Sequence, residues 1–156
     1  MQGRFTRLVV PVAGSEMDDR VLIMLPDLLS SEGGTITFLF VVEVPQSMPL
    51  DAELPTDIDT GEQALRHAEN VIRRALPSRN TNIVTELLQA RAVGAAIVDE
   101  AIERDADAIV MSAAVHRRHG RPTLSETAVH VLLNAPCEVV VIRTVPAPLP
   151  ASGMQG

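Results

Sequence analysis

The sequence contains no lysine, tryptophan or tyrosine, and its 156 residues include three phenylalanines and one cysteine. So few aromatic side chains argue against nucleic-acid recognition by base stacking and against an aromatic cage for cations. The single cysteine, Cys137, excludes an intramolecular disulfide and suits a reducing compartment. All 13 basic residues are arginine, which we interpret as compositional bias rather than as a mechanism.

Long hydrophobic runs are also missing. No apolar stretch approaches the roughly 18 residues that a membrane helix needs, so we expect no direct membrane insertion. The apolar stretch from Leu8 to Val12 is too short for the core of a signal peptide, and we expect a cytoplasmic protein. The net charge of −7 argues against a nucleic-acid partner, because such binding needs a broad basic field.

Short apolar runs alternate with stretches of helical periodicity along most of the chain. The runs predict five buried strands, at residues 7–12, 35–44, 82–88, 107–112 and 137–143. The intervening stretches predict four helices: one after Ser15 that Pro26 shortens or kinks, one with a buried stripe over 65–76, and two at 93–104 and 123–134.

This alternation predicts a single doubly wound α/β domain, with a five-stranded parallel sheet and helices on both faces. We expect the domain to cover residues 5–145 and a mobile tail to follow at 146–156.

Two segments contain candidate helix-capping boxes. Residues 45–61 contain prolines and acids and are interpreted as a loop, either a lid, a partner site or disordered chain, with Thr60 and Gln63 as a capping box for the next helix. Thr123 and Glu126 form a second candidate capping box, and Ser125 is the alternative N-cap.

Doubly wound sheets bind ligands at the carboxyl ends of their strands. After the fourth strand, residues 111–122 hold three arginines and two histidines and lead into a helix. This segment is either an anion site or a solvated loop. His116 and His119 have no further ligand nearby, so we expect no metal. Ser112 and Ser125 lack a base, and Cys137 fits a small core residue, so we expect no catalytic residue.

Three segments, at residues 8–16, 97–111 and 135–143, carry a family resemblance. They read LVVPVAGSE, then IVDEA running into ADAIVM, then APCEVVVIR. In this order and at these distances they resemble the universal stress protein family over about residues 7–143. The resemblance implies an adenine nucleotide alpha hydrolase-like fold.

Many members of that family bind ATP through three glycines and a Ser or Thr after the fourth strand. The corresponding residues here are Ser112, Val115, Ser125 and Glu126. No glycine is kept, Val115 is β-branched, and the Glu126 carboxylate repels phosphate. Ala13 stands where ATP-binding relatives have an aspartate. The resemblance therefore implies a vestigial pocket, made of Val12, Ala13, Gly14, Val41, Met111, Ser112, Val115, Arg117, Arg118, Ser125 and Glu126.

These observations favour a non-enzymatic stress-response or regulatory module with a degraded ATP site and no cofactor. One alternative is a nucleotide-binding protein, with weak ATP hydrolysis left open, that uses Arg117, Arg118 and Arg121 instead of glycines. Another is the cytoplasmic regulatory domain of an amino-acid permease or antiporter, which the Val-Pro-Val-Ala opening resembles; its partner would be a membrane transporter.

The last predicted strand, with Val139, Val140, Val141 and Ile142, is apolar on both faces. At a sheet edge it must be covered or paired. The resemblance implies a homodimer through this strand, and two-fold symmetry is common among such assemblies. The alternative is a central strand covered within the monomer.

Overall fold

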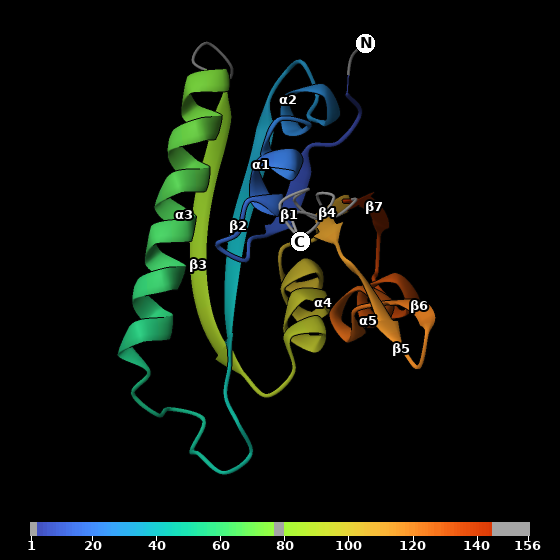
Figure 1. The fold of residues 1–156 in the computed structure, drawn as a ribbon. Coiled ribbons are helices and arrows are strands. Elements are labelled where there is room, and N and C mark those ends of the chain that lie inside the picture. The colour runs from blue at the N-terminus through green and yellow to red at the C-terminus, as the bar shows by residue number, and fades with distance from the viewer. Residues whose placement is uncertain (1–2, 77–79, 145–156) are drawn as a thin grey trace, which may run out of the picture.

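The computed structural model describes residues 3–76 and 80–144. Its centre is a five-stranded parallel sheet in the order β3-β2-β1-β4-β7 (Figure 1). The strands are β1 (Arg7–Pro11), β2 (Gly34–Glu43), β3 (Thr81–Ala90), β4 (Ala108–Ala113) and β7 (Glu138–Arg143). The predicted doubly wound sheet is therefore confirmed.

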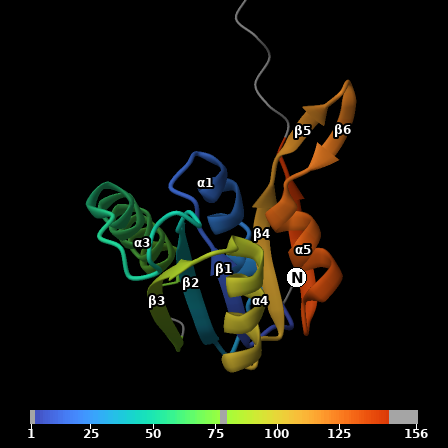
Figure 2. The same ribbon diagram turned by 90° about the horizontal axis from the view of Figure 1, so that it is seen from below.

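Helices cover both faces of this sheet (Figure 2). One face carries α1 (Met17–Leu22), α2 (Leu25–Leu28) and α3 (Pro55–Ala75), and the other carries α4 (Val93–Glu103) and α5 (Glu126–Asn134). The helix predicted after Ser15 is broken as expected, and Pro26 lies in the first turn of α2, where a missing N–H costs nothing.

The β1 strand shows why the apolar runs form the sheet. Leu8, Val9 and Val10 are all at most 1% exposed. Leu8 and Val10 point into the core under α1 and α3, whereas Val9 points into the core under α4 and α5. A central parallel strand buries both faces, so its sequence is apolar without alternation.

The start of α3 differs from the prediction. The helix begins at Pro55 with Leu54 as its N-cap residue, so the predicted loop to Gly61 and the Thr60–Gln63 capping box are wrong. Proline is favoured in the first helical turn. Gly61 lies inside the helix because it packs closely on the sheet: a Cβ there would lie 2.6 Å from Phe40 Cδ1.

The segment before α5 forms a hairpin that the sequence did not predict. Strands β5 (Val115–Arg118) and β6 (Arg121–Leu124) pair antiparallel. The two turn residues, His119 and Gly120, both have positive φ, at 53° and 78°, as a type I′ turn requires.

The hairpin also moves the start of α5. Thr123 lies in β6 and is not an N-cap, so that prediction is wrong, and Glu126 is the first rather than the third helical residue. The alternative cap is confirmed, because the Ala128 N–H donates to Ser125 Oγ at 3.2 Å. Leu124 pairs with Val115 and packs on the α4–α5 core, which draws this segment into a strand.

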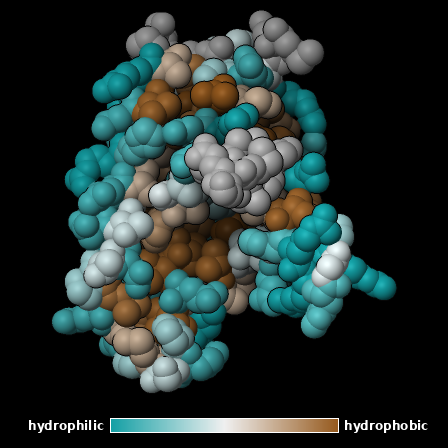
Figure 3. Space-filling view, in the orientation of Figure 1, coloured by the Kyte–Doolittle hydropathy of each residue, from teal (hydrophilic) through white to brown (hydrophobic). Residues whose placement is uncertain are grey.

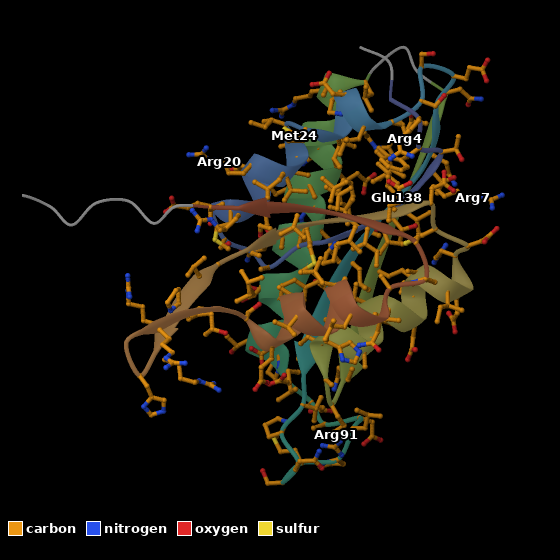
Figure 4. All side chains as sticks on the ribbon, turned by 90° about the vertical axis from the view of Figure 1, so that its right-hand side faces the viewer. Arg4, Arg7, Arg20, Met24, Arg91 and Glu138 are labelled. Carbon is orange, nitrogen blue, oxygen red and sulfur yellow. The ribbon has the colours of Figure 1, made fainter. Side chains whose placement is uncertain are left out.

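The β7 strand lies at one edge of the sheet and pairs with β4 over its whole length. Its start is fixed by an ion pair between Arg4 and Glu138 (Figure 4). The predicted tail at 146–156, with residue 145, lies outside the described residues. Within the part of the chain that the structure describes, no helix is both long enough and apolar enough to span a membrane.

Candidate functional site

The carboxyl ends of β1, β2 and β4 hold most of the predicted pocket residues. Val12 follows β1, is 7% exposed, and its N–H donates to the Leu39 carbonyl at 2.9 Å. Val41 and Met111 pack in the core under α4 and α5. All three side chains therefore contribute to the hydrophobic core.

The loop after β1 is occupied by an acidic side chain. Ala13 N–H donates to Asp18 Oδ1 at 2.9 Å, and Gly14 N–H donates to Asp18 Oδ2 at 2.8 Å. Asp18 is only 6% exposed. The two backbone donors after the carboxyl end of β1 therefore already have an anionic acceptor within the protein.

Of the three residues at the positions of the family glycines, Ser112 and Val115 lie in strands, whereas Ser125 is the N-cap residue of α5. Ser112 is part of β4, opposite Ile142 of β7. Val115 opens β5, opposite Leu124 of β6. A glycine loop places its backbone amides around phosphate. Here residues 112 and 115 instead lie in paired strands.

A cavity of about 670 Å³ lies between the β5–β6 hairpin and α5. We call it the hairpin cavity. Of the predicted site residues, it is lined by Arg117, Arg118, Ser125 and Glu126; the other lining residues are His116, Thr123, Leu124, Thr127, Val129, His130, Leu133 and Asn134. The structure thus separates the predicted pocket into two groups, since Val12, Ala13, Gly14, Val41, Met111, Ser112 and Val115 do not line this cavity.

Within the residues that the structure describes, no charged side chain that lines the hairpin cavity forms an ion pair. Arg117 Nη1 donates to the Gly120 carbonyl at 3.1 Å, which holds its guanidinium near the turn. Arg118 is exposed and has no ion-pair partner among the described residues. Glu126 lies in the first turn of α5, where a carboxylate interacts favourably with the helix dipole. The cavity can attract an anion, but Glu126 opposes a phosphate at the helix end itself.

Cys137 lies in surroundings that disfavour reactivity of its thiol. Cys137 is half-buried against the α4–α5 core, and burial raises the pKa of its thiol, which disfavours the reactive thiolate. No group of three or more His, Cys, Asp or Glu side chains that could hold a metal occurs within residues 3–76 and 80–144.

Sequence reasoning missed several residues that shape these sites. Among them is Asp18, which the sequence marks only as an acid near the start of a helix. His130, Val129 and Leu133 line the hairpin cavity from α5. Leu133 lies three residues after His130 and four after Val129, and these spacings place it on one helix face with each of them.

Comparisons with known proteins agree with the fold. The model of the universal stress protein family matches residues 4–143. The solved universal stress protein from Archaeoglobus fulgidus is 22% identical, with a TM-score of 0.66, and the match covers 89% of this chain and 99% of that one. The universal stress protein UspA from Lactobacillus plantarum is 24% identical, with a TM-score of 0.59, over 90% of this chain and 99% of that one.

A universal stress protein family protein from Arabidopsis thaliana, solved with AMP bound, is 16% identical, with a TM-score of 0.62. That match covers 96% of this chain and 99% of the other. No relative was found among curated proteins. At these identities the solved structures show a shared fold.

Proposed function

Because the chain belongs to the universal stress protein family, we propose that it is a non-enzymatic stress-response or regulatory module that has lost the family's phosphate site. A solved relative was obtained with AMP bound, so nucleotide binding is the property against which this chain must be judged. Loss of that property leaves a rigid α/β scaffold that acts through protein contacts.

The β5–β6 hairpin is the observation that carries this proposal. Its two strands pair between Val115 and Leu124, in the stretch that would otherwise fold around phosphate. The Asp18 carboxylate at Ala13 and Gly14 supports the same conclusion, because an incoming anion would have to displace it.

A thermal-shift panel with ATP, ADP and AMP in the presence of Mg²⁺ tests the proposal. A ligand at 100 times its Kd would add about 2.7 kcal/mol to the free energy of unfolding. We expect no shift for the wild-type protein, and none for the double variant Val115→Gly with Glu126→Ser. Exposed Glu62, on α3, provides the control variant Glu62→Ser. An ATP-dependent shift that grows in the double variant would contradict the proposal, because it would reveal a working phosphate site.

One observation favours a second candidate function, nucleotide binding through arginines. The hairpin cavity is large enough for a small ligand and presents Arg117 and Arg118 beside the start of α5. In this case ATP would stabilise the wild type, and the stabilisation would disappear in Arg118→Ala while Arg74→Ala, on the exposed side of α3, retained it.

The proposed assembly is a homodimer through β7. This strand is the open edge of the sheet beside β4, and Val139, Val140, Val141 and Ile142 are only half-buried. Pairing with a second copy would cover the edge, which otherwise invites non-specific association.

A further inference from the structure

The loop between β2 and α3 is held in one conformation by two side chains from the end of β3. Arg91 Nη1 donates to the carbonyls of Pro45 and Met48 at 2.5 and 2.7 Å. Gln89 Nε2 donates to the carbonyls of Leu50 and Ala52, both at 3.0 Å. Figure 4 shows Arg91 inside this loop. A loop whose backbone carbonyls are bound in this way is pre-organised for contact with a partner.

The tip of this loop presents an apolar side chain among acids. We call residues 50–53 the acidic knob. Leu50 is 49% exposed, and Asp51 and Glu53 are also exposed. From residue 44 to residue 65 the chain has five acidic residues and no basic one. The knob is thus a leucine surrounded by negative charge.

The hairpin cavity has the opposite character. Its apolar part is formed by Leu124, Val129 and Leu133, and Leu133 is 78% exposed. Its rim carries Arg117 and Arg118, and Glu126, at the start of α5, is the one acid among its lining residues. Figure 3 shows hydrophilic residues gathered over β5 and β6. The stretch 116–121 holds three arginines and two histidines without an acid.

The pairing of the hairpin adds a reason to expect an acidic occupant. Arg118 lies directly opposite Arg121 in the β5–β6 register. Like charges at such positions repel each other and destabilise the hairpin. Carboxylates placed between them would remove the repulsion, so an acidic segment fits this surface better than a neutral one.

Knob and cavity lie at the same end of the molecule. A smaller cavity of about 240 Å³ is lined by Glu43 and Arg91 beside the knob loop, and by Glu126, Thr127 and His130 beside the hairpin cavity. Two surfaces at one end can meet their counterparts in a second copy across a two-fold axis, which forms both contacts at once.

We propose that the acidic knob of one copy docks in the hairpin cavity of a second copy, with Leu50 over Leu133 and with Asp51 and Glu53 facing Arg118 and Arg121. Charge complementarity within one sequence is the argument for a second copy as the occupant. The contact is separate from the β7 edge and does not depend on the proposed function.

Sedimentation velocity with charge-reversed variants tests this contact. The protein is examined from about 5 to about 500 µM, in about 50 and about 500 mM NaCl, because salt screens surface charges. Variant one carries Arg118→Glu and Arg121→Glu, and variant two carries Asp51→Arg and Glu53→Arg. The matched controls reverse the same number of charges elsewhere: Arg66→Glu with Arg74→Glu, and Asp27→Arg with Glu32→Arg.

The wild type should associate at low salt, with an association constant at least about tenfold lower at high salt. In each variant alone, the association constant should fall by at least about tenfold, because knob and cavity then carry charge of the same sign. An equimolar mixture of the two variants should regain it, since each knob again faces a cavity of opposite charge. If the chain already forms a dimer through β7, the same changes in association constant are expected for the association of two dimers into a tetramer.

Three results would overturn the proposal. The wild type could show no salt-sensitive association, which would leave the cavity to an acidic partner of another kind. Both variants could associate as the wild type does, which would place the interface elsewhere. The mixture could fail to regain what each variant lost, which would show that knob and cavity do not contact each other.

Discussion

Asp18 joins the loop after β1 to the first turn of α1. Its two carboxylate oxygens accept the N–H groups of Ala13 and Gly14, and hydrogen bonds to a charged acceptor are stronger than neutral ones. We expect Asp18→Ala to lower the free energy of unfolding by about 1–2 kcal/mol, because both donors lose their acceptor. Urea denaturation measures this change.

The neighbouring residue provides the control. Asp19 is exposed and pairs with His67 at 2.8 Å, and exposed pairs contribute little. Asp19→Ala should therefore cost no more than about 0.5 kcal/mol. Equal losses in the two variants would show that the Asp18 carboxylate has no special role in the loop.

Asp107 binds the backbone at the start of β1 in the same way. It should also make the free energy of unfolding depend on pH in the acidic range. Its Oδ2 accepts the Thr6 N–H at 2.6 Å, the Thr6 hydroxyl at 2.8 Å and the Arg7 N–H at 3.1 Å. Burial alone would raise the pKa of Asp107, but the hydrogen bonds from Thr6 and Arg7 outweigh it and lower this pKa. A carboxyl with a depressed pKa stabilises the fold above its unfolded-state pKa, and this contribution is lost as the pH falls through the folded-state value.

Asp107→Asn should therefore be less stable than the wild type near neutral pH. The difference should shrink as the pH falls below the unfolded aspartate value of about 3.9. Denaturation curves between about pH 2 and pH 7 measure it. A difference that stays constant over this range would assign the effect of the substitution to packing rather than to charge.

At the scale of elements, one arginine fastens α4 to the edge strand β3. Arg104 pairs with Glu86 of β3 and donates from Nε to Glu100 Oε2 of its own helix at 3.0 Å. Glu100 is only 5% exposed. A hydrogen bond with Glu100, burial and repulsion between the two carboxyls together raise the pKa of Glu86. The positive charge of Arg104 thus offsets the repulsion between the adjacent carboxylates of Glu86 and Glu100.

Arg104→Ala should lower the free energy of unfolding by about 2 kcal/mol at neutral pH, less than for a fully buried pair because Arg104 is partly exposed. Without the guanidinium the pKa of Glu86 rises further. A carboxyl with a raised folded-state pKa loses stability as the pH rises through that value, so the deficit should be smaller near pH 5 than near pH 7.5. The double variant Glu86→Gln with Arg104→Ala should lose this pH dependence. A deficit that does not change with pH would contradict the account.

The elements differ in how far sequence alone could define them. β1 could be predicted because a run such as Leu8–Val10 has both faces buried. The start of α3 could not, because Gly61 within the helix is explained by its close approach to Phe40 of β2 and Leu87 of β3, which are distant in the sequence. The hairpin lacks the usual Asn-Gly turn signal and uses His119-Gly120 instead.

For the whole molecule, the parallel sheet with helices on both faces follows from the alternation of strands and helices, whereas the order of the strands and the site do not. Sequence reasoning could show that glycines are missing at Ser112 and Val115. It could not show that the freed segment folds as a hairpin, or that Asp18 turns back onto Ala13 and Gly14. Both depend on pairings and turns whose register the sequence pattern leaves undetermined.

The β7 edge offers a prediction about assembly. If two copies pair through this strand, those alternate amides of residues 139–142 that point away from β4 become hydrogen-bonded in the dimer, and their exchange with deuterium slows. Their exchange should therefore become slower as the protein concentration rises, while amides of the central strand β1 keep a constant rate. Fast exchange of these outward-pointing β7 amides at every concentration, together with a monomer mass, would contradict the dimer.

Native mass spectrometry of the purified protein, alone and with added ATP, tests the central claim most directly. The account predicts an assembly of 16.8 kDa chains that carries no nucleotide as purified and binds none when ATP is added. One nucleotide retained per chain, and lost in Arg118→Ala, would contradict it and would assign to the arginines of the hairpin the role that glycines have in ATP-binding relatives.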